Sequence, residues 1–382
     1  MNFLQWAVCS ASLALLASSC TASESRPTAV VPPAATSGTK EPQPATAPSA
    51  PSVRPTAAVP IEVPTTEGTD KPVSAARSTR PMVVFRGMCD ASGAVVLDPT
   101  HFAVADDEDN VLRVYDGESG GDPVSSVDVS KSLALPVKKK TPEADIEAAT
   151  RVGDRALWLT SHGLSSKGKL QPARFRFFAT TAPTQGFEVA PVGTAYQNLL
   201  SDMIAAPQLA RFDLGAAAQL APKLNGGLNI EGMTARLDGT SVLIGFRNPV
   251  PDQKALLVPL LNPLRVIAGE TAQLGEPELL DLGGRGVRSL TSWRGRYLIM
   301  AGSSGSEHRS VLFVWDGNAL PRPITALDLS DINPEAFVSR DEQDEVMFLS
   351  DDGTVEIGGI PCKKLKDRTK KQFRGLWVRV AP

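Results

Sequence analysis

Five short stretches of this chain repeat one pattern, a charged residue followed by small or apolar residues. They are Asp90-Ala91-Ser92, Glu147-Ala148-Ala149, Glu231-Gly232-Met233, Arg288-Ser289-Leu290 and Glu335-Ala336-Phe337. Each stretch leads to a second apolar run, such as HFAVADD in the first unit and EVMFLSDDG in the fifth. When repeated units close into a ring, a charge at the same place in each unit forms a ring of charges. The pattern therefore restricts the chain to repeat architectures.

Each unit divides into about four short strands separated by turn signals. The Asp-Gly turns are Asp116-Gly117, Asp238-Gly239, Asp316-Gly317 and Asp352-Gly353. One unit of four short strands matches one propeller blade. We therefore predict an all-β fold, a β-propeller of five blades with six as the alternative. The strands expected in the fifth unit are 334–340, 345–351, 354–360 and 375–381.

One gap between units is long and carries a helical pattern. Apolar residues at helical spacing are Tyr196, Leu199, Leu200, Met203 and Ile204. Pro207 ends this helix, and Leu214–Leu220 is a second short helix candidate. We expect a small helical insertion at 195–222, which either covers one face of the ring or serves as a packed strut.

The N-terminal segment predicts export. Residues 1–19 form a short apolar signal peptide, and the small residues before Cys20 are typical of a bacterial lipobox in which that cysteine is lipidated. An ordinary signal peptide is the alternative. Thr21, rather than an Asp, after the cysteine favours the outer membrane as the destination of such a lipoprotein in the cell envelope, and a periplasmic protein is the alternative. Residues 20–80, rich in Pro, Ala, Ser and Thr, are expected to form a disordered tether before the folded domain at 81–382.

Two predictions concern the ends of the folded domain. Strand 82–85 at its start and strand 375–380 at its end would pair and close the ring. Cys89 and Cys362 lie near the same two ends, and export makes a disulfide between them an option. Two small buried thiols are the other interpretation.

The repeated charges are the candidate site. The first strand of a blade lines the channel, so the carboxylates of Asp90, Glu147, Glu231 and Glu335 would converge and suit Ca²⁺, with Arg288 as a ligand-binding fifth member. Two alternatives remain: the acids are neutralised by Arg288 and by strand-end amides, or they form a pocket for a charged ligand.

Two further features are less specific. His162, just after the second strand of unit two, fits either a general base at the channel mouth or a loop histidine bonded to backbone. The acidic run 106–110 resembles a calcium loop, but Val111 stands where a ligand is needed, and we predict a solvated hairpin turn.

Three segments resemble a bacterial family of domains of unknown function, DUF3616. They are MCDASGAVVLDPTHFAVADDEDNVLRVYD, GGLNIEGMTARLDGTSVLIGFRNPV and GGRGVRSL. The family brings no established activity. A weaker resemblance, carried by Glu231-Gly232, is to esterase-like phytase and lactonase propellers, and it implies that Glu231 is a ligand to a central divalent cation.

The net charge and the motifs limit the classes of function that the chain could have. The net charge of −3 lacks the basic footprint of a nucleic-acid binder, and no zinc-protease motif or P-loop is present. We expect a monomer attached to the membrane by its lipid, with a binding or scaffolding role toward a small molecule, glycan or protein. The alternative is a metal-dependent hydrolase of a phosphoester or ester.

Overall fold

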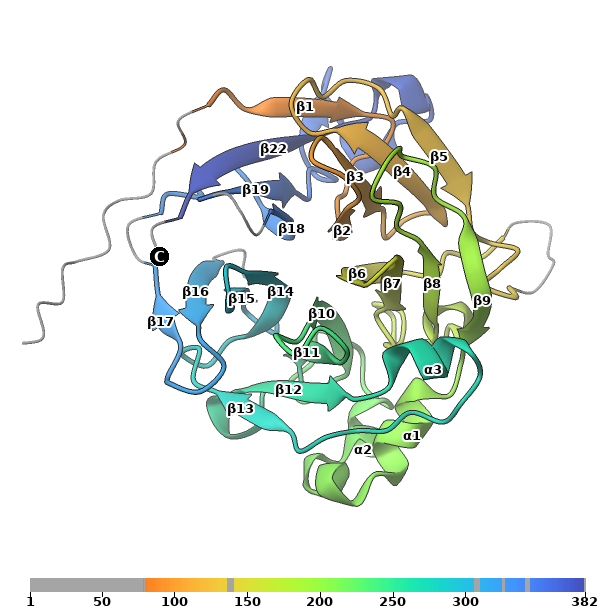
Figure 1. The fold of residues 1–382 in the computed structure, drawn as a ribbon, viewed down its shortest axis with the longest axis vertical. Coiled ribbons are helices and arrows are strands. Elements are labelled where there is room, and N and C mark those ends of the chain that lie inside the picture. The colour runs from red at the N-terminus through yellow and green to blue at the C-terminus, as the bar shows by residue number, and fades with distance from the viewer. Residues whose placement is uncertain are drawn as a thin grey trace, which may run out of the picture. The chain divides into compact units, whose positions relative to one another are not determined.

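Five four-stranded antiparallel sheets stand around one axis in the computed structural model of the chain (Figure 1). The structure describes residues 78, 80–135, 141–305, 310–324, 327–340 and 344–380. The expected signal peptide, Cys20 and nearly all of the expected tether lie outside these residues, and the predictions about them stay predictions. No helix in the described ranges is long and apolar enough to cross a membrane.

Four blades follow the chain outward from the axis. Blade one is β2 (Gly93–Val96), β3 (His101–Ala105), β4 (Val111–Asp116) and β5 (Ser125–Asp128). Blade two is β6 (Ile146–Val152), β7 (Arg155–Thr160), β8 (Phe177–Thr181) and β9 (Pro191–Tyr196). Blade three is β10 (Asn229–Ala235), β11 (Val242–Asn248), β12 (Ala255–Leu260) and β13 (Glu278–Leu280). Blade four is β14 (Gly286–Trp293), β15 (Arg296–Gly302), β16 (Val311–Trp315) and β17 (Arg322–Pro323).

The fifth blade joins the two ends of the domain. Its strands from the axis outward are β18 (Pro334–Ser339), β19 (Glu345–Ser350), β22 (Gln372–Arg379) and β1 (Val83–Arg86). β1 pairs antiparallel with β22, which places Val83 opposite Gly375. The predicted pairing of the first and last strands is therefore confirmed, and it satisfies an edge that would otherwise be exposed.

The strand expected at 354–360 is not part of this blade. The segment instead forms a separate hairpin of β20 (Glu356–Ile357) and β21 (Ile360–Pro361). Gly358 and Gly359 turn it with φ of 60° and 80°, values that suit a two-residue hairpin turn. The prediction was wrong because ring closure gives the third place of the last blade to β22 and the fourth to β1.

The inner strands close the ring. β2 lies beside β6, β6 beside β10, β10 beside β14, β14 beside β18, and β18 beside β2 (Figure 1). The predicted five-bladed propeller is thereby confirmed. Side-chain hydroxyls join these neighbours: Thr150 Oγ1 accepts from the Ala235 amide at 2.8 Å, and Thr234 Oγ1 accepts from the Ser292 amide at 2.7 Å. These bonds tie blade two to three and blade three to four.

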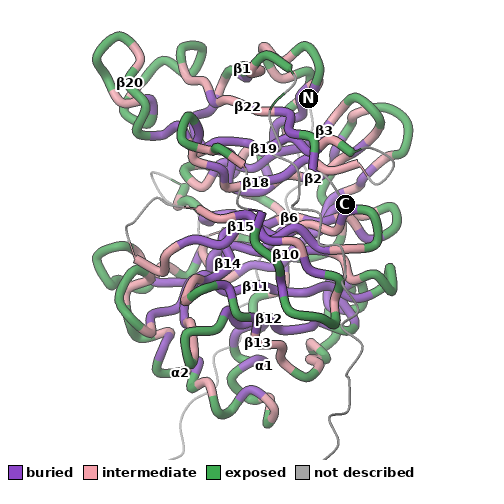
Figure 2. Tube along the Cα trace, turned by 90° about the vertical axis from the view of Figure 1, so that its left-hand side faces the viewer, coloured by how far each residue is buried: buried purple, intermediate pink, exposed green. Residues whose placement is uncertain are grey.

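Five hydrophobic clusters fill the five interfaces between blades. The strand β7 shows how one strand serves two of them, because successive side chains point to opposite faces. Leu157 and Leu159 pack toward blade three, whereas Ala156 and Trp158 pack toward blade one. Burial on both faces explains why these strands are continuous apolar runs, and Figure 2 shows buried residues on the strands and exposed ones in the connections.

The predicted helical insertion is present between β9 and β10. The helices are α1 (Leu199–Ala205), α2 (Leu214–Ala217) and, further on, α3 (Pro263–Ile267), with short 3-10 turns η1 (Pro172–Arg174), η2 (Pro207–Phe212), η3 (Pro251–Gln253), η4 (Cys362–Lys364) and η5 (Arg368–Lys370). Leu199 and Met203 are fully buried in the core between blades two and three. This packing fits the strut interpretation. Tyr196, expected on the helix, instead ends β9 opposite Phe177.

Aromatic rings and a disulfide hold the seam between blades five and one. The Phe85 ring stacks on Phe373 at 4.9 Å and meets Phe102 edge-on at 5.3 Å. Cys89 and Cys362 are joined by a disulfide across 273 positions of sequence. Of the two interpretations of these cysteines, the structure holds the bonded one.

We expect loss of this disulfide to destabilise the domain. A cross-link that closes so long a loop removes much of the freedom of the unfolded chain, so the Cys89→Ser/Cys362→Ser variant should lose about 2–5 kcal/mol of unfolding free energy. Urea unfolding of the variant and of the oxidised wild type measures this loss. Equal midpoints and slopes would show that the seam is held by β1 and the aromatic rings alone.

Candidate functional site

Bulges interrupt the pairing of four inner strands, and each falls on a repeated charged residue. In β6 the register steps from Ile146 to Ala148, which leaves Glu147 without a partner on β7. The residues left out in the same way in β10, β14 and β18 are Glu231, Arg288 and Glu335. A bulge re-aims the side chain it releases. These charges therefore leave the blade faces and gather at the end of the axis where the inner strands begin.

The small residues of the repeat have a steric cause. A Cβ on Gly232 would lie 2.5 Å from Cγ1 of Val287 in the next blade, and one on Gly93 would lie 3.0 Å from the backbone of Ala148. Inner strands approach most closely at the axis, so side chains beside the bulges must be small. The sequence pattern of a charged residue followed by a small one therefore reflects both the bulge and the close approach of neighbouring inner strands.

Blade three neutralises its own acid. Arg247, on β11, donates to Glu231 Oε1 at 2.6 Å, and the Asn229 amide donates to the same oxygen at 2.7 Å. Arg247 also donates to the carbonyl oxygens of Ser303 and Gly305, each at 3.0 Å. Glu231 Oε2, in a residue 6% exposed, has no hydrogen-bond partner in the described part of the chain.

Arg288 occupies the middle of the charged group. It forms an ion pair with Glu335 and is only 3% exposed. Burial lowers the pKa of the Arg288 guanidinium, while Glu231, Asp351 and Asp90 act to raise it. The structure therefore places Arg288 within the fields of acids from three blades, as the repeat pattern requires.

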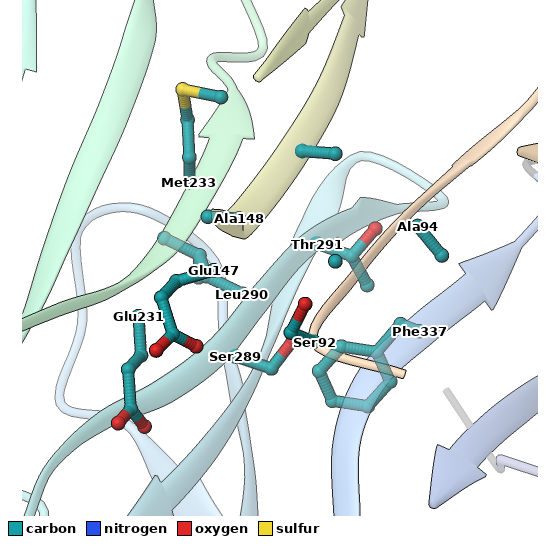
Figure 3. A pocket seen from close by; sticks show the side chains of 12 residues that line it. Ser92, Ala94, Glu147, Ala148, Glu231, Met233, Ser289, Leu290, Thr291 and Phe337 are labelled. Carbon is teal, nitrogen blue, oxygen red and sulfur yellow. The ribbon is translucent and has the colours of Figure 1, made fainter. Parts of the chain in front are cut away.

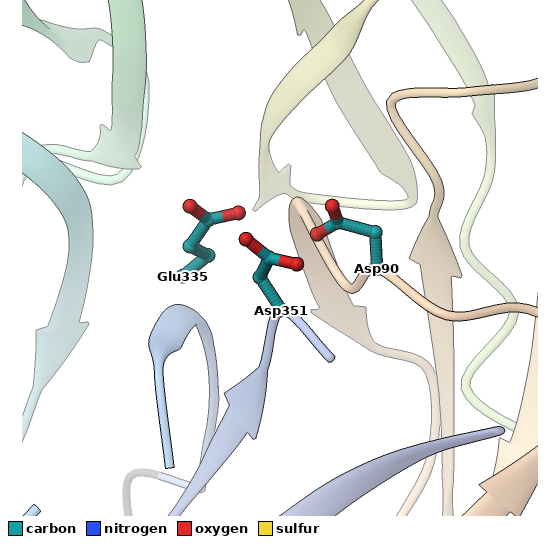
Figure 4. A group of neighbouring side chains, drawn as sticks. All are labelled: Asp90, Glu335 and Asp351. Atoms are coloured by element: carbon teal, nitrogen blue, oxygen red, sulfur yellow. The ribbon is translucent and has the colours of Figure 1, made fainter. Parts of the chain in front are cut away.

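Asp90, Glu335 and Asp351 form a compact group of carboxylates (Figure 4). One oxygen from each lies within 4.8 Å of the others. Burial raises the pKa of Asp90 well above its usual value, and the charges of Asp107, Asp351 and Asp106 raise it further. Two like charges about 4 Å apart repel by roughly 4 kcal/mol at the effective dielectric of a protein surface, so this group favours any cation that joins it.

Glu147 belongs to a neighbouring group with Asp145 and Asp107. Burial raises the pKa of Glu147 well above its usual value, followed by the effects of Asp145, Glu231 and Asp107. Burial likewise raises the pKa of Asp145 to about 6, although Arg174 at 2.8 Å opposes the shift. No hydrogen bond or ion pair holds the Glu147 carboxylate among the described residues, and Figure 3 shows it beside Glu231.

Three residues of the site were not predicted from the sequence: Asp351, Arg247 and Asp107. Each follows or ends the second strand of a blade, which in an antiparallel pair lies beside the start of the first strand. The Asp-Asp pairs that close HFAVADD and EVMFLSDD were the available signal. The prediction that 106–110 is a solvated turn was wrong for Asp106 and Asn110, which are 3% and 6% exposed, because the β3–β4 turn packs at this crowded end.

A narrow cavity continues from the charged end along the axis (Figure 3). Glu147 and Glu231 line it together with the side chains of Ser289, Leu290 and Phe337. The far mouth is wider and carries arginines at the ends of the inner strands. One of these, Arg151, donates to the carbonyl oxygens of Leu97 and Ala182, so it serves the blade interfaces and not a ligand.

His162 is buried away from this cavity. It is 0% exposed, and its Nδ1 lies 2.8 Å from the Thr160 carbonyl oxygen, which matches the interpretation as a backbone-bonded loop histidine. Burial lowers the pKa of the His162 imidazole to about 4. Nε2 has no partner among the described residues. A histidine so enclosed cannot reach a substrate in the axial cavity without a rearrangement.

His162 should make the fold sensitive to acid. Between pH 6.5 and about 4 the unfolded chain binds a proton at this histidine that the folded protein does not, so stability falls as the pH drops through that window. The loss approaches about 3 kcal/mol by pH 4. In His162→Asn, whose side chain tolerates the local φ of 53°, the stability difference from wild type should be constant above pH 7 and should shift in favour of the variant by about 3 kcal/mol at pH 4. Unfolding midpoints measured from pH 4 to 8 test this; parallel curves would contradict it.

Residues 187–323 match the model of a family described as protein of unknown function (DUF3616). The match covers blades three and four and confirms the resemblance carried by GGLNIEGMTARLDGTSVLIGFRNPV and GGRGVRSL, whereas the segment beginning MCDASG lies outside it. No curated protein matches the chain in sequence.

Two of the solved structures that are similar to the chain have low TM-scores and low sequence identities to it. The glutaminyl cyclase of Myxococcus xanthus has a TM-score of 0.40 and 11% identity, covering 80% of this chain and 97% of its own. The PQQ-bound aldose sugar dehydrogenase of Streptomyces coelicolor has a TM-score of 0.41 and 8% identity, covering 80% of this chain and 98% of its own.

Proposed function

We propose that this protein is an exported, lipid-anchored binding module of the cell envelope. Its propeller holds a positively charged ligand at the carboxylate-rich end of the axis. The observation that carries the proposal is the convergence there of Asp90, Glu147, Glu231, Glu335 and Asp351, of which only Glu231 and Glu335 have an ion-pair partner among the described residues. The ligand would be a small molecule, a glycan or a protein. It would supply the missing positive charge itself or bring a metal ion.

Two features of the chain support export. The sequence before residue 81 reads as signal, lipobox and tether, and a disulfide joins Cys89 to Cys362 in the folded domain. Disulfides persist mainly in oxidising compartments such as the periplasm and the outer surface of bacteria. A tether of this composition would let the propeller stand away from the membrane while its anchor at Cys20 keeps it in the envelope.

A metal-dependent hydrolase of the phytase or lactonase kind is the second candidate function, and the close carboxylates of Asp90, Glu335 and Asp351 favour it. Hydrolysis also needs a base within reach of a metal-bound substrate. His162 is enclosed, so the base would have to be one of the acids with a raised pKa, such as Glu147. The binding role needs only the charged face, and for that reason we place it first.

Fractionation of expressing cells tests the anchor. Cys20→Ser should move the protein from the membrane to the soluble fraction, because the thiol that carries the lipid is gone, whereas Cys9→Ser, a change within the expected signal peptide, should leave the protein in the membrane. Thr21→Asp should shift it from the outer to the inner membrane in a Gram-negative host. Membrane retention of Cys20→Ser would contradict the lipoprotein assignment.

A further inference from the structure

We infer that Asp90, Glu335 and Asp351 bind one Ca²⁺ ion at the end of the propeller axis. The inference deepens the proposed function, because it names the cation held at the same charged face. The three side chains come from the start of blade one, the inner strand of blade five and the end of the second strand of blade five. A bound ion would therefore join the first and last blades at the seam of the ring.

The spacing of the oxygens suits calcium. Ca²⁺ lies 2.3–2.6 Å from its oxygen ligands and takes six to eight of them in flexible geometry, so two ligands on opposite sides of one ion stand up to about 5 Å apart. The three carboxylate oxygens lie within 4.8 Å of one another, inside this limit. The group can thus reach a single Ca²⁺ without moving a strand.

Unpartnered buried oxygens point to a missing ligand. Asp90 is 9% exposed, yet its Oδ1 has no hydrogen-bond partner within the described ranges, and Figure 4 shows its carboxylate turned toward Glu335 and Asp351. Asn333 Oδ1 is also buried and unpartnered, while its amide nitrogen donates to Asp351 Oδ2 at 3.0 Å. A buried oxygen without a partner is costly, and coordination to a hard cation would satisfy that of Asp90.

The local charge matches a divalent ion. Arg288 pairs with Glu335, so the three carboxylates, once all of them are ionised, and the guanidinium together carry two negative charges. One Ca²⁺ balances this remainder. Arg288 alone does not balance this charge. The alternative explanation, that Arg288 is the only counter-ion, must be separated from metal binding by experiment.

The site is held in position before any ion arrives. Asp90 bridges to Asp351 in an antiparallel pair, and the Asp352 amide donates to the carbonyl oxygen of Cys89 at 2.9 Å. The disulfide to Cys362 fastens this same segment, and the Gly353 amide donates to Asp351 Oδ1 at 2.8 Å. Because the ligands are already ordered, binding loses little conformational entropy.

Calcium titration of the full chain tests the site. Isothermal calorimetry with CaCl₂ after EDTA treatment should show one ion bound, and Ca²⁺ should raise the melting temperature. Asp351→Asn should weaken Ca²⁺ binding by about tenfold or more, since changes even beyond the direct ligands commonly cost that much. Without Ca²⁺ the same variant should melt at or above the wild-type temperature, because it relieves repulsion; Asp122→Asn, on an exposed turn, should bind and melt as wild type.

Arg288→Met separates the metal from its rival. If Ca²⁺ is the counter-ion, the variant melts lower without the ion, and Ca²⁺ raises its melting temperature by more than it raises that of wild type. The inference is overturned if wild type binds no Ca²⁺, if Asp351→Asn and Glu335→Gln both bind it as wild type does, or if Ca²⁺ fails to rescue Arg288→Met. Membrane fractionation does not involve Ca²⁺, so failure of the envelope proposal would be seen separately.

Discussion

The bulge at the start of four of the five inner strands is the feature on which the rest of the site depends. A regular ladder would keep Glu147, Glu231, Arg288 and Glu335 on the blade faces, where the hydrophobic interfaces lie and a charge would be costly. Leaving one residue unpaired lets the strand continue into the core while its charge turns to the axis. In four of the five repeats, one position thus determines both the bulge of the inner strand and the placement of a charge at the axis.

The surrounding blades make this arrangement rigid. Each interface is filled by apolar side chains from two neighbouring blades, and the close approach at the axis permits no methyl group on Gly232 without displacing Val287. Ring closure through β1 and β22, reinforced by Phe85 and the Cys89–Cys362 disulfide, prevents the blades from separating. Groups on such elements hold their spacing more precisely than groups on loops, which matters for carboxylates that repel one another.

Much of the fold could be predicted from local pattern, and the site only in part. The five repeats, the helices near Leu199 and the pairing of 82–85 with the last strand follow from periodicity and from the need to cover an edge. The hairpin at 354–360 could not be foreseen, because its strand-like composition is outweighed by the demand of closure. Arg247 lies on a second strand and Asp351 directly follows one. Both were missed because only antiparallel pairing brings them beside Glu231 and Asp90.

The distribution of positive charge decides what the axial end does. Arg247 satisfies one oxygen of Glu231, and Arg288 pairs with Glu335, so both guanidinium groups are engaged while Asp90 and Asp351 have no ion-pair partner among the described residues. The most direct measurement is the anomalous diffraction of crystals grown with Ca²⁺. We expect one peak bounded by oxygens of Asp90, Glu335 and Asp351. No peak there, with Arg288 in hydrogen-bond contact with all three carboxylates, would contradict a metal site and leave the arginine as the sole counter-ion.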